Sequence, residues 1–137
     1  MALPSVGGGY QPNDGNLNEL RIGAAAAPQT ATTTATLTAA QVTGGILVGS
    51  PGTSAADYTL PTATSIDAIM TNMKVGSTFN LTIINLGTSS GVITVLAGTG
   101  ITLVGMATLP ITTSAGSSGT WTFRKTGDAA YTAYRVS

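Results

Sequence analysis

Hydrophobic and polar residues repeat with two different periods between residues 58 and 86. Four residues at the i, i+3, i+4 and i+7 positions predict a short helix with one apolar face: Ile66, Ile69, Met70 and Met73. Apolar residues then alternate with polar ones along residues 78–86, which is the pattern of a half-buried strand. This alternation is carried by Phe79, Leu81 and Ile83. The stretch therefore predicts a strand, a helix and a second strand in succession.

Signals for both ends of this helix are present. Thr64 stands three residues before Asp67, which predicts a capping box with the acid in the positively polarised first turn. Lys74 lies near the negatively polarised end, and Gly76 suits the left-handed conformation that often ends a helix. A helix of about three turns does not bury its apolar face alone. We therefore expect it to pack on the end or the side of a sheet.

Short apolar segments recur along the rest of the chain, separated by Gly, Pro and Ser. Besides residues 78–86, the predicted strands are residues 36–38, 46–48, 57–60, 92–96, 101–104, 106–112, 120–125 and 131–136. Strands that recur about every 8–12 residues with turn signals between them are typical of antiparallel sandwiches and barrels. The sequence thus predicts an all-β fold, an antiparallel β-sandwich or jelly-roll-like domain with one short helix.

The predicted strand at residues 92–96 is apolar on both of its faces. One face is expected to contact the core, so the other face needs a second covering layer. In a domain of this size the simplest cover is another subunit. We therefore expect Val92, Ile93 and Val95 to form a contact between subunits.

Residues 1–35 differ from the strand-rich domain predicted for residues 36–137, because they contain chain-breaking and small residues without a sustained period. The exception is a mildly amphipathic run at residues 17–22, which fits one turn of helix or an added strand. We interpret residues 1–35 as an extended arm that becomes ordered on a neighbouring protein; the alternative is an unattached terminal tail. The candidate contact residues of the arm are Tyr10, Leu17, Leu20, Arg21 and Ile22.

Charge and composition limit the partners of this chain. Only ten of its 137 side chains are charged, five of each sign, whereas charged residues make up about a quarter of an ordinary soluble domain. Without a basic stripe we expect neither nucleic acid nor an anionic membrane as a partner. No apolar run approaches the ~20 residues of a membrane span, and the N-terminus lacks the features of a secretory signal. We expect synthesis in a cytoplasm and, because little charge repulsion opposes association, a permanent assembly.

The sequence offers few groups for catalysis or metal binding. It contains no His and no Cys, and its carboxylates are scattered: Asp14, Glu19, Asp57, Asp67 and Asp128. Counted from Asp14, a calcium loop would need Gly and Glu where Glu19 and Ala25 stand. The glycines of residues 98–100 are not followed by the Lys-Ser/Thr pair of a phosphate loop. We expect no enzyme, no metal and no cofactor; a carbohydrate-active enzyme built on converging carboxylates is the remote alternative.

Basic and aromatic residues near the C-terminus suggest a small surface patch. Arg124, Lys125, Arg135 and Tyr134 belong to two predicted strands that can be neighbours, so they could bind an anion or a partner. The simpler interpretation is a solvated strand edge that its cations protect from aggregation. Scattered aromatic residues could also stack on sugars, although such residues more often belong to a core or its rim.

Four stretches are similar to virion surface proteins of tailed bacteriophages, in particular the capsid decoration (cement) proteins: Tyr58–Pro61 with the helix after it, Val75–Asn85, Ala97–Ile101 and Tyr134–Val136. The resemblance covers residues 36–137. It implies a homotrimer of β-sandwich or jelly-roll domains on the outside of the virion head, without catalytic residues. It also implies that the N-terminal arm contacts the major capsid protein.

The same strand pattern, with Gly98-Thr99-Gly100, is also similar to the tips of some phage head and tail fibres. This second resemblance implies a binding module for host surface glycans. The number of copies in each virion separates the two hypotheses, because a decoration protein covers the head whereas a fibre tip is present in few copies.

Overall fold

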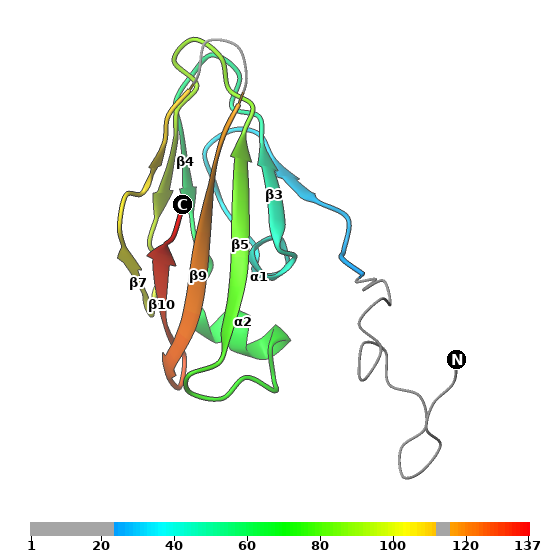
Figure 1. Cartoon of the computed structure of the whole chain (residues 1–137), viewed down its shortest axis with the longest axis vertical. Helices are drawn as coiled ribbons and strands as arrows, with labels where there is room; N and C mark the ends of the chain where they lie inside the picture. The colour runs from blue at the N-terminus through cyan, green and yellow to red at the C-terminus, as the bar shows by residue number, and fades with distance from the viewer. Residues whose placement is uncertain (1–23, 112–115) are drawn as a thin grey trace, which may run out of the picture.

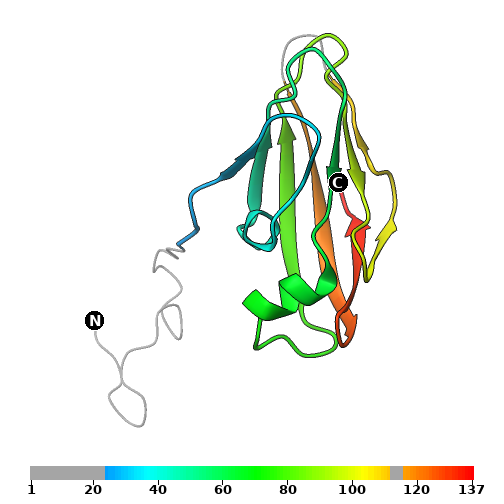
Figure 2. The same cartoon turned by 180° about the vertical axis from the view of Figure 1, so that it is seen from behind.

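Consecutive strands lie in opposite sheets along most of the chain. The computed structural model describes residues 24–111 and 116–137 and shows two layers along one long axis (Figure 1). One layer is a six-stranded sheet in the order β1 (Gln29–Ala31), β3 (Ile46–Gly49), β5 (Thr78–Asn85), β9 (Ser117–Gly127), β10 (Ala130–Arg135) and β7 (Ile101–Val104). The other has the order β2 (Ala35–Thr36), β4 (Ala56–Thr59), β6 (Ile93–Leu96) and β8 (Thr108–Leu109). Figure 2 shows the molecule from behind.

This alternation explains why most strand pairs are parallel. Neighbours such as β1 and β3, β3 and β5, or β4 and β6 are two strands apart in the chain and run in the same direction. The pairs β2–β4 and β7–β10 are parallel as well. Only β5–β9, β9–β10 and β6–β8 are antiparallel among the described residues. The all-β prediction is therefore confirmed in outline, but the antiparallel arrangement is wrong and a jelly roll is not confirmed.

The core lies between the two sheets and takes large side chains from both. Those from the six-stranded sheet include Leu81, Ile83, Trp121, Phe123 and Tyr131, and those from the four-stranded sheet include Tyr58, Ile93 and Leu109. At Gly49 the two layers come so close that an added Cβ would lie 2.5 Å from Ile93 Cδ1. A larger residue at this position would have to displace the side chains of Ile93 and Tyr58. The alternation predicted for residues 78–86 is confirmed, because Leu81 and Ile83 are buried beside half-buried Thr82.

Two short helices complete the domain. Helix α1 (Ala39–Thr43), which the sequence pattern did not predict, begins with a capping box formed by Thr38 and Gln41. Helix α2 (Ala63–Ile69) covers the lower end of the molecule in Figure 1 and buries Ile66. It begins at Thr62 rather than at Thr64, because the Thr62 side chain accepts a hydrogen bond from the Ser65 backbone N–H. It also ends earlier than predicted, so Met73 and Lys74 lie beyond the helix. Ile69 is half-exposed, so its predicted place on the buried face of the helix is wrong.

One buried polar side chain joins the two layers near the end of the molecule opposite to α2. Asn85, at the end of β5, is fully buried. Its amide nitrogen donates to the backbone carbonyls of Gly91 (3.0 Å) and Leu109 (3.1 Å), and its oxygen accepts from the Gly87 N–H (2.8 Å). These bonds satisfy the amide in an apolar environment and tie β5 to β8 of the other sheet.

The predicted boundary at residue 35 falls inside the folded part. Strand β1 begins at Gln29 and pairs with β3, so the domain starts at least seven residues before the predicted start at residue 36. Most of the predicted arm, residues 1–23, lies outside the described residues.

Candidate functional site

The three described carboxylates do not form a common site. Asp57 is exposed on β4, Asp128 is exposed in the turn between β9 and β10, and Asp67 belongs to α2. Residues 24–111 and 116–137 contain no group of three or more residues that could hold a metal ion. Nor does any helix in these ranges have the length and apolar character needed to cross a membrane.

Asp67 instead belongs to a hydrogen-bonded network inside the lower end of the domain. Its carboxylate accepts hydrogen bonds from Lys125 Nζ (2.7 Å), the Tyr131 hydroxyl (2.5 Å) and the Ala129 backbone N–H (2.9 Å). The bonds from Lys125 and Tyr131 lower the pKa of Asp67 to about 2. Burial, reinforced by the bond to the charged Asp67, raises the pKa of Tyr131 above 10.0. The network thus keeps Asp67 charged and Tyr131 protonated, which suits a structural anchor.

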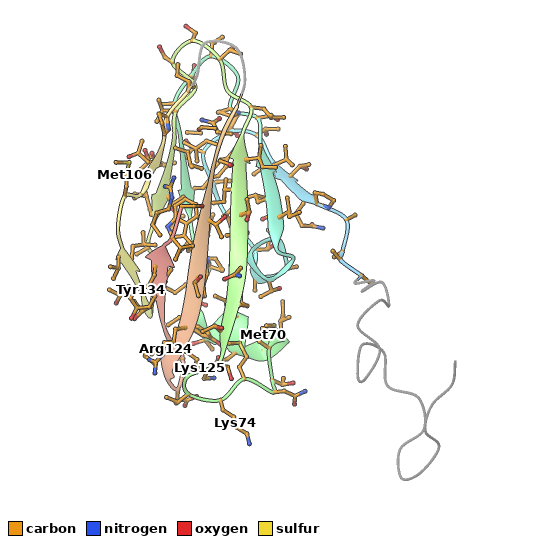
Figure 3. The ribbon with its side chains drawn as sticks, viewed as in Figure 1. Met70, Lys74, Met106, Arg124, Lys125 and Tyr134 are labelled. Carbon is orange, nitrogen blue, oxygen red and sulfur yellow. The ribbon has the colours of Figure 1, made fainter. Side chains whose placement is uncertain are left out.

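The predicted patch of Arg124, Lys125, Arg135 and Tyr134 is divided by the sheet. Arg124 and Tyr134 lie on the outer face of the six-stranded sheet, whereas Lys125 and Arg135 belong to its inner side. Figure 3 shows Arg124 and Lys125 near the lower end of β9, with Tyr134 higher on β10. The prediction of one patch is wrong because adjacent residues of a strand point to opposite faces.

Arg135 is a packing residue at the end of β10. Its guanidinium lies over the ring of Trp121, 4.6 Å from the ring centroid. It donates hydrogen bonds to the backbone carbonyls of Met106 (3.1 Å) and Ser137. Burial lowers the pKa of Arg135. Arg135 therefore joins β10 to the segment between β7 and β8.

Two of the three predicted subunit contacts belong to the core of the chain itself. Ile93 and Val95 are 0% and 1% exposed and point between the sheets, so their side chains are not on a surface that a second subunit could contact. Val92 is half-buried and precedes β6. The outer face of β6 carries Thr94 and Leu96, and of these two only Leu96 is exposed and apolar.

All five residues predicted to contact a partner through the arm lie outside the described residues: Tyr10, Leu17, Leu20, Arg21 and Ile22.

The outer face of the six-stranded sheet is an ordered array of small polar side chains. In one row, Thr82 on β5 lies opposite Thr120 on β9, and their hydroxyls are 2.9 Å apart. In the next row, the Thr122 hydroxyl donates to Asn80 Oδ1 at 2.8 Å, and Tyr134 lies opposite Thr122. Such an array provides hydroxyl and amide groups with little charge, and the sequence pattern did not predict it.

An exposed apolar group adjoins this array at the edge of the sheet. It consists of Val104, Met106, Tyr134 and Val136, which are 45%, 66%, 38% and 59% exposed. We call these four residues the β7 edge patch. Figure 3 shows Met106 and Tyr134 on the same lateral side of the molecule. Of these four residues, only Tyr134 belonged to the basic and aromatic surface patch predicted from the sequence. The other three residues have the apolar pattern of ordinary strands.

Comparisons with known proteins identify no relative of this chain: no family model, no curated protein and no solved structure matches it.

Proposed function

We propose that this protein is a structural component of a tailed-bacteriophage virion: a homotrimeric decoration, or cement, protein that binds the outside of the head and stabilises the capsid lattice. It would be synthesised in the host cytoplasm and reside on the capsid exterior. In this proposal it has no catalytic activity and needs no cofactor. A sandwich-like domain of the jelly-roll type would stand on the capsid, and the major capsid protein would be its partner.

The observation that carries the proposal is the β7 edge patch on a domain with few charges. Among the described residues only seven side chains are charged: Asp57, Asp67, Lys74, Arg124, Lys125, Asp128 and Arg135. Exposed apolar groups on a weakly charged surface favour association, which is suited to a protein that functions inside an assembly. The sequence resemblance of residues 36–137 supplies the type of assembly.

The capsid contact is assigned to the N-terminal segment, residues 1–23, in which Tyr10 is the aromatic residue. Three such segments in a trimer would bind the lattice together, and each would raise the effective concentration of the others. Weak individual contacts would therefore be enough for tight attachment. Burial of apolar surface, at about 25 cal/mol per Å², would supply more of the affinity than charge.

The test is the binding of purified protein to phage heads that lack it. Full-length protein should sediment with the heads in a saturable manner and raise the temperature at which they rupture. A variant that lacks residues 1–23 should remain folded, because every described strand and helix is kept, but should no longer sediment with the heads. Equal binding by the truncated protein would refute the role of the segment, and no binding by either form would refute the decoration function.

A fibre tip that binds host surface glycans is the second candidate. The array of Thr82, Thr120, Thr122, Asn80 and Tyr134 favours it, because hydroxyl and amide groups beside an aromatic ring are groups that bind sugars. Under this alternative the protein would bind host cells or their isolated polysaccharide. Substitution of Asn80 and Thr122 by Ala would abolish that binding. A decoration protein would bind heads equally well with both substitutions.

A further inference from the structure

Strand β7 is the least protected edge of the described sheets. Edge strands expose unpaired backbone groups, and proteins usually protect them with charge, with proline or by making them very short. Strands β2 and β8 have two residues each, β8 is followed by Pro110, and the three-residue β1 is preceded by Pro28. By contrast, β7 has four residues, none of them charged, between Gly100 and Gly105. The unpaired backbone N–H and C=O groups of such an edge are available for pairing with another strand.

The β7 edge patch extends this edge with apolar side chains. Val104 lies opposite Tyr134 in the β7–β10 pair. Val136 follows Tyr134 by two residues and shares its face. Met106 follows Val104 by two residues, and its backbone carbonyl is held by Arg135. The patch is therefore fixed in place by strand pairing and by Arg135, and it is ready to accept another extended segment.

A segment of suitable pattern lies outside the described residues. Residues 1–23 precede the described part, and the chain enters the sheet at β1, the edge opposite β7. In an extended conformation Leu20 and Ile22 would share one face, and Glu19 and Arg21 the other. The apolar face of this pattern, Leu20 and Ile22, thus matches the exposed apolar side chains of the β7 edge patch.

We propose that residues 17–22 of one copy pair with β7 of a neighbouring copy as an added strand, with Leu20 and Ile22 beside Val104 on the outer face. This inference rests on the homotrimer in the proposed function. A cyclic trimer needs a heterologous contact in which two different surfaces of each copy meet. The β1 side and the β7 side provide such a pair of surfaces. The capsid contact is then left to residues 1–16, which include Tyr10.

Chain length favours the neighbour over the same copy. The six strands span about 24 Å at a spacing of about 4.8 Å. The nine residues from Leu20 to Gln29 span about 30 Å when fully extended. To reach its own β7, the segment would have to run almost straight across its own sheet. To reach a neighbour whose β7 adjoins its β1, it needs only a short path.

Disulfide formation tests this arrangement, because the natural chain contains no Cys. A tagged Leu20→Cys protein is mixed with untagged Val104→Cys protein, reassembled and oxidised. The matched control replaces Val104→Cys by Leu96→Cys, since Leu96 is an apolar strand residue of similar exposure (41%) on the other sheet. An Ile22→Cys protein covers a register shifted by two residues. Disulfides require Cα atoms within about 7 Å, so only close contact gives a link.

We expect tagged and untagged chains to become linked with several-fold higher yield for Val104→Cys than for Leu96→Cys, with Leu20→Cys or Ile22→Cys as the donor. Equal yields for both positions would overturn the proposal. So would links that form only within one chain when both cysteines are placed in the same protein. The native mass is measured in parallel. A trimer without the link would refute this contact and leave the decoration function standing, whereas binding to heads without any trimer would refute the subunit arrangement.

Discussion

Lys125 Nζ lies 2.7 Å from Asp67 Oδ1, and this ion pair joins β9 to α2 at the lower end of the domain. The same carboxylate accepts the hydrogen bond of the Ala129 N–H. Ala129 has a positive φ of 47°, a conformation that is uncommon for residues other than glycine. Asp67 therefore stabilises the turn between β9 and β10 in addition to attaching the helix to the sheet.

Asp67→Asn should destabilise the protein. The Asn side chain can still accept from Tyr131 or Ala129, but it leaves the Lys125 ammonium without its negative partner in a partly buried position. Asp57→Asn is the matched control, because Asp57 is exposed on β4 and its replacement should change stability by less than about 0.5 kcal/mol. Thermal unfolding should show a lower midpoint for Asp67→Asn only. Equal midpoints for the two variants would show that the ion pair contributes nothing to stability.

Stability should depend on pH in the acidic range. The pKa of Asp67 is lowered from 3.8 to about 2 in the folded state. The stabilisation from its charged form is therefore fully present above about pH 4 and is lost as the pH falls from about 4 to about 2. Urea unfolding measured between pH 6 and pH 2 should show this loss in the natural protein and a smaller loss in Asp67→Asn. Parallel curves for the two proteins would contradict the assignment.

Ile66 and Ile69 in the same helix should respond very differently to truncation. Ile66 is fully buried between α2 and the sheets, so Ile66→Ala should cost about 2–5 kcal/mol through lost contacts and a cavity. Ile69 is half-exposed, and Ile69→Ala should cost much less. Chemical denaturation of both variants compares them directly. A larger cost at Ile69 would mean that the helix presents another face to the core.

Much of the element pattern was predictable from sequence, and the pairing of strands was not. The alternation of Leu81 and Ile83 with polar residues correctly placed β5. By contrast, the turn signals between strands predicted antiparallel sheets, whereas at residues 87–91 the chain crosses from β5 in one sheet to β6 in the other. A turn within one sheet and a crossing between two sheets are both short, and they look alike in sequence. Whether a turn joins two strands of one sheet or two sheets depends on contacts between distant residues, which a local pattern does not contain.

The candidate site was predictable to a smaller extent for the same reason. Val95 was expected at a subunit contact and is part of the core, because the small polar Thr94 faces outward instead. Lys125 was expected on the surface and instead pairs with Asp67, 58 residues away in the chain. Tyr134 was the single residue of the β7 edge patch among the predicted site residues. Period-2 alternation identifies two faces of a strand, but it does not say which face is covered when both are apolar.

Asn85 provides a test of the link between the two layers. Asn85→Ala should leave the buried carbonyls of Gly91 and Leu109 without their donor, and each unsatisfied group costs about 1–3 kcal/mol. Asn80→Ala in the same strand removes a hydrogen bond on the exposed outer face and should cost less than 1 kcal/mol by the same rule. Denaturant unfolding of the two variants measures the difference. Equal costs would indicate that Asn85 does not hold the sheets together.

The number of copies in the virion separates a decoration protein from every other role considered for this chain. Quantitative mass spectrometry of purified phage particles gives the molar ratio of this protein to the major capsid protein. A decoration protein should be present at a fixed ratio of the same order as the capsid subunits, and it should be lost together with the head surface layer when particles are stripped. Absence from particles, or a few copies that fractionate with the tail, would contradict the decoration function.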